Sequence, residues 1–481
     1  MLTACSEDFL ELPSEVSLSS GTFFQTESDF QQAINGTYAA LRPLYDGDNG
    51  MWALGEMRSD NTHYAFNPDF RALVAQEEIA DFLNIPANAI STTIYIENYQ
   101  VIARANQILA FIDGVDFNAA SKERIRGEAH FLRALCYFNL VQSFGEIPMH
   151  LIPATTREET ALPLSSVDDV YAQIISDAQD AASLLGSKSE MEPGRATSGA
   201  ANTLLGNVFM VREQWSEAAN ALQSVVNSGE YALIADYAGA FDVGNPNNSE
   251  SVFEVQYQEG TDGFASSFIY EWLPYPLSAE QVGDLTNTSN PQALTEGEGF
   301  NIPTPDLIAL YEDGDERLAA SIATIELNDG RVIPYCTKLL QPHSLHLLTG
   351  TNWPVYRYSE TLLLLAEALN ESNNTAQAAD YLNQVRARAG LAPTTAASQS
   401  ELRDAILRER RVELSFEGKR WFDLVRTGRA VDVMSAYGER VKANPQDYYY
   451  PGTISPAPSS YTNIELLFPL PASESLLSPF F

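Results

Sequence analysis

The sequence predicts a mostly α-helical protein in which about four pairs of helices form a scaffold and carry a large, irregular, loop-rich second lobe with short strands. Two observations predict this architecture. Long segments repeat apolar residues at steps of three and four, the spacing of a helix with one buried face. Between residues 232 and 354 this periodicity gives way to glycine, proline, asparagine and aromatic residues. With 481 residues, 45% of them hydrophobic, the chain can bury an extensive core.

The helix that anchors the scaffold is expected in the stretch at residues 402–428. It follows the cap residues Ser398 and Ser400, and its apolar side chains fall on one helical stripe. These side chains are Leu402, Ala405, Ile406, Val412 and Phe416. Gly418 is expected to end the helix, and a short aromatic segment that stops at Gly428 should follow. We expect the remaining helices to pack against this stretch.

Two acidic residues, Glu409 and Glu413, continue the same apolar stripe. Burying a carboxylate without a cation costs on the order of several kcal/mol, so cations must meet both. Arginine suits this role because its planar guanidinium binds a carboxylate through two nitrogen atoms. The arginines nearby in the sequence are Arg408, Arg410, Arg411 and Arg420. We predict an internal ion network that holds the core together without contacting a ligand.

The other helices follow from caps and periodicity. The first should begin near Thr26, a cap residue type, and stop before Pro43. Two long helices are expected at residues 90–112 and 121–144, because each carries an unbroken apolar stripe. A further helix with a continuous stripe is expected at residues 166–185.

Residues 195–231 are predicted to form two antiparallel helices joined around residues 213–216. Small residues would let the two helices approach closely: Ala201, Gly206, Ala218 and Ala219. This is the spacing of a tetratricopeptide repeat. The segments YRYSETLLLLAEALN and TAQAADYLNQVRARAGL repeat the design. Such pairs cannot bury their faces alone, so about four must stack, with residues 402–428 completing the last.

The pattern divides the chain into four parts. Residues 1–20 form a polar tether, residues 21–231 the first helical region, and residues 232–355 the irregular lobe. Residues 356–481 form the second helical region and a tyrosine- and proline-rich tail expected to wrap back across the lobe. An unstructured connection as long as the third part is improbable inside a plain helical stack, so it must fold as a lobe. There we expect a strand at 251–257 and a helix at 304–312.

The chain is strongly acidic. Its 28 basic and 64 acidic residues give a formal net charge of −36. Nucleic acid is therefore excluded as a partner, because phosphate binding depends on clustered cations. Such an acid excess destabilises the compact state through self-repulsion, which salt screens, and suggests a salty habitat.

Catalytic motifs are missing from the sequence. HExxH, GxSxG, P-loop and CxxC patterns do not occur, so we predict a protein that is not an enzyme and holds no catalytic metal. His343 and His346 lack a third ligand nearby in sequence. The acidic loops at residues 46–49 and 313–315 lack full EF-hand spacing, which leaves structural calcium as the one cofactor alternative. A disulfide between Cys136 and Cys336 is left open.

Two stretches have the composition of a sugar-binding surface. Sugars present apolar C–H faces that stack on aromatic rings, and hydroxyl groups that bond to Asp, Asn and Arg. Residues 60–71 and 264–275 combine these side chains. The candidate ligand-binding residues are Asp60, Asn61, His63, Tyr64, Phe66, Phe70, Arg71, Tyr270, Trp272 and Tyr275. Core packing is the alternative for each single ring, because aromatic side chains are mostly buried.

The segment ERRVELSFEGKRWFDLVRTG resembles the C-terminal signature of the RagB/SusD family, nutrient-binding surface lipoproteins of Bacteroidetes-type bacteria that sit on TonB-dependent transporters. Further segments resemble the family's landmarks in the family's own order: NYQVIARANQILAFI, GEAHFLRALCYFNLVQSFGEIPM, RATSGAANTLLGNVF, NIPTPDLIALYEDGDERLAASIA, YRYSETLLLLAEALN, VRARAGL and LLFPLPASE. The resemblance covers nearly the whole chain. It implies a tetratricopeptide-like frame, a variable lobe with the ligand site, and a lid-like position over a β-barrel transporter.

The resemblance also implies a function: binding of an oligosaccharide or polysaccharide and its delivery to a SusC-like TonB-dependent transporter. Leu2-Thr3-Ala4-Cys5 resembles a lipoprotein processing site, so Cys5 should carry the lipid that holds the protein on the cell-surface side of the outer membrane. The family's glycan site uses the loop between the first two helices and the variable lobe. The two candidate stretches occupy matching places, although no residue can be carried over by motif.

Three alternatives stay open at this point. In the first alternative, the protein is such a receptor but its ligand is a peptide or another nutrient. In the second, the stacked helices form a soluble tetratricopeptide adaptor that binds a protein tail. The third is a glycosidase, since carboxylate pairs can be drawn anywhere among 64 acidic residues.

The acidic balance predicts that salt stabilises the protein. Raising NaCl from about 0.05 M to about 0.5 M screens repulsion among the exposed carboxylates. The free energy of unfolding, measured by urea denaturation at each salt concentration, should therefore rise. An unchanged unfolding midpoint would show that self-repulsion is not a significant cost.

Overall fold

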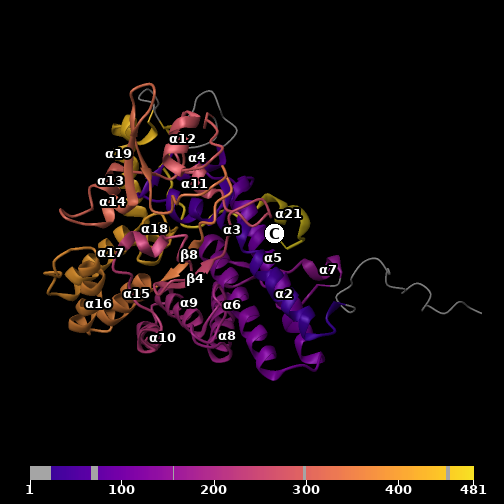
Figure 1. Ribbon diagram of the computed structural model, residues 1–481. Helices are drawn as coiled ribbons and strands as arrows, with labels where there is room; N and C mark the ends of the chain where they lie inside the picture. Colours follow the sequence, from indigo (N-terminus) through magenta and orange to yellow (C-terminus); the bar gives the residue numbers. More distant parts are fainter. Residues whose placement is uncertain (1–22, 67–73, 155, 296–298, 451–455, 481) are drawn as a thin grey trace, which may run out of the picture.

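The computed structural model in Figure 1 describes residues 23–66, 74–154, 156–295, 299–450 and 456–480. Its α-helices are α2 (Glu27–Ala39), α3 (Arg42–Tyr45), α4 (Val74–Ala80), α5 (Ala89–Phe111), α6 (Ala119–Phe144), α7 (Arg157–Thr160), α8 (Val167–Leu184), α9 (Ser198–Val211), α10 (Trp215–Asn227), α11 (Phe268–Glu271), α12 (Ala279–Thr286), α13 (Pro305–Ile308), α14 (Arg317–Ser321), α15 (Tyr358–Glu371), α16 (Thr375–Arg388), α17 (Gln399–Glu413), α18 (Arg420–Arg426), α19 (Ala430–Ala443), α20 (Gln446–Tyr449) and α21 (Ala472–Leu477). Its strands are β1 (Thr62–His63), β2 (Ile147–Pro148), β3 (Leu164–Ser165), β4 (Ser251–Val255), β5 (Ile302–Pro303), β6 (Ile322–Glu326), β7 (Val332–Cys336) and β8 (Trp353–Arg357).

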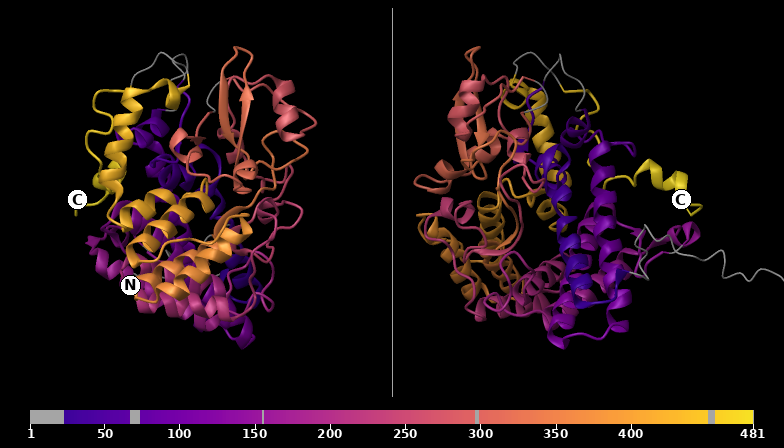
Figure 2. Two further views of the ribbon diagram at one scale, coloured as in Figure 1. Left: turned by 90° about the vertical axis from the view of Figure 1, so that its left-hand side faces the viewer. Right: turned by 45° about the vertical axis from the view of Figure 1, so that its right-hand side comes forward.

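Stacked helices form a frame at the base of the molecule (Figure 2). The first series packs in chain order, α5 on α6, α6 on α8, α8 on α9 and α9 on α10. Helix α10 then contacts α15, which packs against both α16 and α17. The close approach of α9 and α10 requires Gly206, because a Cβ there would lie 2.5 Å from Leu222 Cγ. The predicted mostly α-helical scaffold of helix pairs is confirmed.

Side-chain caps set the starts of several of these helices. Thr26 caps α2 and Ser398 caps α17, and in both the third helical residue returns a bond to the backbone of the cap. Ser166 caps α8 by accepting from the backbone N–H of Asp169. These starts lie within a few residues of those expected from the sequence.

The irregular lobe is built on short antiparallel strand pairs. Strand β4 pairs with β8, with Val255 opposite Trp353, and β6 pairs with β7 as a hairpin. Helix α13 is shorter than the helix expected at residues 304–312, since it covers only Pro305–Ile308. Figure 2 shows these elements above the helical frame.

Helix α17 ends earlier than predicted. It stops at Glu413, and Phe416 takes a left-handed backbone conformation with φ 68° instead of continuing the helix. The buried carboxylate of Glu56 accepts the backbone N–H groups of Phe416 at 2.8 Å and Gly418 at 3.1 Å. A long-range acceptor therefore ends the helix before the sequence signal at Gly418 does.

A buried ion network surrounds Glu413. Its carboxylate lies 2.5 Å from Arg388, 3.0 Å from Arg357 and 3.1 Å from Arg317. These arginines end α16, end β8 and begin α14, so one carboxylate joins the frame to the lobe. Burial by itself raises the pKa of Glu413, but the guanidinium groups outweigh it and lower the pKa well below its usual range.

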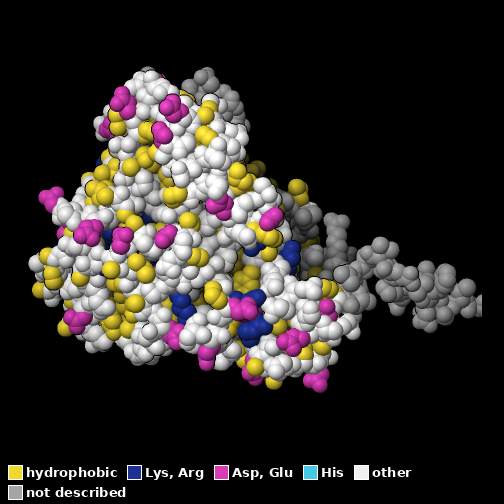
Figure 3. Space-filling model, viewed as in Figure 1, with side chains coloured by type: hydrophobic (Ala, Val, Ile, Leu, Met, Phe, Trp, Pro, Cys, Tyr) yellow, Lys and Arg dark blue, Asp and Glu magenta, His cyan; other side chains and the backbone are white. Residues whose placement is uncertain are grey.

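Two further buried acids complete the network. Glu250 pairs with Arg357 at 2.5 Å and with Arg388 at 2.9 Å. Glu417 pairs with Arg357 at 2.7 Å and with Lys338 at 2.5 Å. Each acid thus meets two cations, which is the condition under which buried charges are tolerated. Acidic side chains are meanwhile scattered over the face of the molecule seen in Figure 3.

The burial of Glu409 and Glu413 is confirmed, but the predicted partners were wrong. The predicted cations were Arg408, Arg410, Arg411 and Arg420. Instead, Arg410 pairs with Asp423, while Arg411 and Arg420 pair with Asp60. Arg408 is exposed and donates to a backbone carbonyl. Residues one or two positions apart on a helix point to different faces, so Glu409 instead pairs with Arg317 and Arg386, which approach from other elements.

The network predicts a large cost for removing one charge. Glu413→Gln leaves three buried guanidinium groups short of a carboxylate, so the free energy of unfolding should fall by about 3–5 kcal/mol. Urea denaturation measures it, with Glu439→Gln on the exposed face of α19 as the matched control. Equal midpoints for the two variants would contradict the assigned role of Glu413.

Candidate ligand-binding site

The structure brings the two candidate stretches together. Strand β1, from the first stretch, pairs with β5, with His63 opposite Ile302. The Tyr275 hydroxyl of the second stretch donates to the carbonyl of Ala65 at 3.3 Å. Both stretches therefore contribute to one region at the junction of the frame and the lobe.

Most of the candidate side chains in this region are buried. Seven are at most 8% exposed: Asp60, Asn61, His63, Tyr64, Tyr270, Trp272 and Tyr275. Phe66 is half-buried, and Phe70 and Arg71 lie outside the described residues. A ligand on the surface does not reach the seven buried side chains, so their predicted role as ligand contacts gives way to a role in supporting the surface.

Asp60 and Asn61 are held by internal partners. Asp60 forms ion pairs with Arg411 at 3.0 Å and with Arg420 at 2.8 Å. Burial would raise the pKa of Asp60, but these two guanidinium groups prevail and lower it. The Asn61 amide accepts from Arg411 and donates to Glu56, both within 2.8 Å. The stretch is thereby fixed to α17 and the turn that follows it.

A cluster of tyrosines surrounds the buried carboxyl of Asp81. The hydroxyls of Tyr64 and Tyr449 donate to it at 3.0 Å, and that of Tyr461 donates at 3.2 Å. Burial raises the pKa of Asp81 to about 7, although the three hydroxyls oppose the shift. The cluster ties the first candidate stretch to α20 and to the C-terminal tail.

The His63 ring lies inside the same cluster. Its Nε2 is 3.9 Å from Asp81, and neither ring nitrogen has a hydrogen-bond partner among the described residues. Burial lowers the pKa of His63 to about 3, so the ring is neutral at neutral pH. His63 thus serves as a packed aromatic ring and not as a ligand-facing base.

The aromatic residues of the second stretch form a packed layer. Trp272 meets Trp52 edge to face, with ring centroids 5.7 Å apart. The Tyr270 hydroxyl lies 2.6 Å from Nε2 of His343. The ring that projects outward from this stretch is Phe264, which is 43% exposed and carries the Arg42 guanidinium 4.8 Å above its centroid.

The sequence did not single out the tyrosines of the tail as part of this region. The Tyr449 carbonyl accepts the backbone N–H of Phe66 at 3.0 Å, and its hydroxyl bonds to Asp81. Tyr448 donates to Asp306 at 2.6 Å. The run of three tyrosines at residues 448–450 was the available signal, because such a run is rare in an exposed tail.

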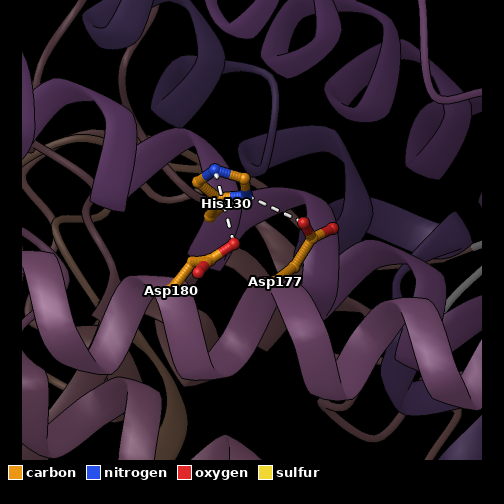
Figure 4. A group of neighbouring side chains, drawn as sticks. All are labelled: His130, Asp177 and Asp180. Atoms are coloured by element: carbon orange, nitrogen blue, oxygen red, sulfur yellow. Dashed lines mark hydrogen bonds and ion pairs between the residues drawn. The ribbon is translucent and has the colours of Figure 1, made fainter.

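One group of side chains has metal-ligating types close together, His130 with Asp177 and Asp180 (Figure 4). His130 Nδ1 lies 2.8 Å from Asp177 Oδ1, and its Nε2 lies 4.0 Å from Asp180 Oδ2. Arg133 already binds both oxygens of Asp177, at 2.7 and 2.8 Å. A metal ion would compete with this guanidinium, so the group acts as a tie between α6 and α8.

Two of the other candidate ligands, Asp46 and Asp315, also have internal partners. Asp46 accepts the backbone N–H groups of Ser267 and Phe268 and so anchors the start of α11. Asp315 binds Arg317 through both carboxylate oxygens. The alternative of a disulfide is wrong, because Cys136 and Cys336 are both free buried thiols.

Comparison with known proteins identifies the family. A profile described as the SusD family matches residues 343–479, and one described as starch-binding, associating with the outer membrane, matches residues 8–210. The SusD-like protein P25 of Formosa agariphila is 30% identical, over 89% of this chain and 88% of that protein. The chain belongs to the SusD family. The resemblance found in the sequence is therefore confirmed.

Other SusD-family proteins match along almost the full chain. SusD-like protein P2 of Formosa agariphila is 27% identical, over 98% of this chain and 94% of that protein. The structure of a laminarin-binding SusD-like protein superimposes with a TM-score of 0.76 at 26% identity, covering 95% of this chain and 98% of that one. Surface glycan-binding protein A of Bacteroides uniformis gives 0.77 at 22% identity, covering 95% and 99%, which shows a shared fold. Among the described residues, no helix combines the length and apolar character needed to cross a membrane.

The Asp81 cluster predicts a specific pH dependence. The folded-state pKa of about 7 lies above the unfolded value of 3.8, so the folded state holds this proton more tightly. The contribution of Asp81 to stability is then greatest at low pH, falls between about pH 4 and pH 7, and is flat above. The wild type should lose stability relative to Asp81→Asn by about 1 kcal/mol per pH unit in that window.

Urea denaturation of both proteins at pH 5 and pH 8 measures this difference. Comparing the variant with the wild type removes the titration of neighbouring groups, His63 and Glu77 among them. If the free energy of unfolding of the wild type instead rose relative to that of the variant as the pH rises, the tyrosine hydroxyls would be stabilising an ionised carboxylate.

Proposed function

We propose that this SusD-family protein binds an oligosaccharide or polysaccharide at the cell surface, without catalysis, and passes it to a SusC-like TonB-dependent transporter. The observation that carries the proposal is the likeness to a laminarin-binding SusD-like protein at 26% identity over 95% of the chain. The description of the N-terminal profile, starch-binding and associating with the outer membrane, supports the same function.

The proposed ligand surface lies where residues 60–66 meet residues 264–275. Phe66 and Phe264 are the aromatic side chains of these described segments that are not buried. Aromatic faces of this kind stack on the apolar faces of sugar rings. Phe70 and Arg71 remain proposed contacts, and the seven buried candidates hold the surface in shape.

The proposed location is the cell-surface side of the outer membrane. Cys5, which lies outside the described residues, is the proposed lipidation site. Several acyl chains on one cysteine give stable membrane attachment. The protein would then lie against the SusC-like transporter that receives its ligand.

The alternatives differ in what the open surface must offer. A glycosidase needs two carboxyl groups that flank a bound sugar. At the proposed surface Asp60 is buried and bonded to arginine side chains, which leaves Glu271 as the one partly exposed acid of residues 60–66 and 264–275 and favours binding over hydrolysis. A peptide receptor or a tetratricopeptide adaptor would show its preference in a binding assay.

The deciding experiment is calorimetry against laminarin, starch, xylan, mannan, alginate and a peptide mixture. Binding of a glycan with no release of reducing ends is the expected result. Release of reducing ends from the bound glycan would identify a glycosidase. Binding of peptides alone would favour a peptide receptor or an adaptor.

Two aromatic substitutions test the proposed surface. Phe66→Ala and Phe264→Ala should each weaken glycan binding by about 1–3 kcal/mol, because each removes one stacking ring. Phe480→Ala, at a ring 56% exposed near the C-terminus, is the matched control. Trp272 is unsuitable, since alanine in the core costs about 3–5 kcal/mol of stability. Unchanged affinity in both variants would discard this surface.

A further inference from the structure

A hollow lies on the outer face of α5, apart from the proposed ligand surface, with a volume of about 480 Å³. Its other walls come from residues 148–154, residues 160–161 and the segment of helix α21. Figures 1 and 2 show α21 standing beside α5. None of its lining residues belongs to the surface formed by residues 60–66 and 264–275. The volume is within the range of small-molecule sites, about 300–1,000 Å³.

The walls of this hollow are held in place by partly buried hydrogen bonds. The Tyr99 hydroxyl donates to the Pro148 carbonyl at 2.6 Å. Asn106 and Tyr137 both donate to the carbonyl of His150, at 2.8 and 2.6 Å. The chain segment opposite α5 is thus fixed by side chains of α5 and α6, so the hollow is preformed.

Aromatic and aliphatic groups dominate the lining. The rings of Tyr95 and Tyr99 lie with their centroids 4.8 Å apart. At the rim, Ile96 is 43% and Ile152 is 75% exposed. Large apolar side chains left in water beside a hollow mark a place where a ligand or partner covers them.

The polar groups of the lining favour a ligand that donates hydrogen bonds. Glu474 places a half-buried carboxyl group at the edge of the hollow. Gln107 lines it too, and its side-chain oxygen has no hydrogen-bond partner among the described residues. Burial lowers the pKa of His150, so at neutral pH its ring is neutral and one ring nitrogen is a hydrogen-bond acceptor. Acceptors beside apolar walls match the hydroxyl groups and C–H faces of a sugar.

The lining also selects against charge. Among the described residues that line the hollow there is no lysine or arginine, and Glu474 is the one acidic residue. A sulfated or carboxylated sugar would meet a carboxylate here with no cation to bind it. The formal net charge of −36 adds to that repulsion.

From these contacts we infer that the hollow between α5, residues 148–154, residues 160–161 and α21 is a second saccharide-binding site, one that takes neutral sugar units. The inference rests on the proposed function, because it assigns the same class of ligand to a separate site. Two sites on one protein engage two parts of a long polymer, which raises the apparent affinity for polysaccharide above that for short fragments.

The test fills the hollow without touching the core. Ala103 is exposed on α5 and lines the hollow, so Ala103→Trp should occupy it. Ala110→Trp, also exposed on α5 but outside the hollow, is the matched control. Ile152→Glu is a second variant, which adds a carboxylate at the rim. Thermal unfolding of each variant establishes that it is folded.

Calorimetry with laminarihexaose, maltohexaose, xylohexaose and mannohexaose is the assay. For the hexasaccharide that binds, the wild type and Ala110→Trp should each take two equivalents, and Ala103→Trp and Ile152→Glu one. Affinity for the corresponding polysaccharide should fall about tenfold in the two site variants.

The remaining outcomes separate the two proposals. One equivalent in the wild type, or two in every variant, overturns the second site and leaves the proposed function standing. The same holds if only acidic glycans such as alginate bind, or if Ala103→Trp loses a protein partner while its sugar stoichiometry is unchanged. Failure of every glycan to bind removes both proposals.

Discussion

The whole fold depends on keeping the charge of Glu413 compensated away from water. Its three arginine partners come from α14, β8 and α16, so the carboxylate is satisfied only when lobe and frame are both in place. A buried acid that lacks one of its cations is costly, whereas the complete set is tolerated. The network therefore favours one relative placement of the two parts, which apolar packing alone would specify less sharply.

The same device recurs around the region of the candidate ligand surface. Glu56 accepts hydrogen bonds from the turn after α17, and Asp60 forms ion pairs with two arginines. Asp81 accepts hydrogen bonds from three tyrosines that lie in separate segments. Each is a buried acid that joins distant parts of the chain. The outer surface near them is thus backed by a layer with little freedom to rearrange. Phe66 and Phe264, the proposed ligand contacts, are among the side chains of these segments that project beyond that layer.

Local features were predictable from the sequence, and distant partners were not. Periodicity and cap residues predicted α2, α5, α6, α8, α9 and α10, because these signals depend only on the residues of each helix and its ends. The partners of Glu413 lie 25 to 96 positions away in the sequence, so no local sequence pattern predicts them. The composition that suits sugar binding equally suits an aromatic core, so the sequence left both roles open for Trp272 and Tyr270, which the structure buries. Strand β8 and helix α19 were not predicted, although the buried residues of α19 recur at helical spacing.

The ties to the C-terminal part of the chain have a consequence for the order in which this protein is made. The Glu56 carboxylate accepts a hydrogen bond from the backbone N–H of Phe416, 360 positions later in the chain. The Asp81 carboxyl accepts one from the hydroxyl of Tyr461, 380 positions later. A chain leaving the ribosome therefore cannot complete the buried contacts of its first helical region until nearly all of it has emerged. Contacts that span so much sequence also slow folding. Completion of these buried contacts is thus delayed to the end of synthesis.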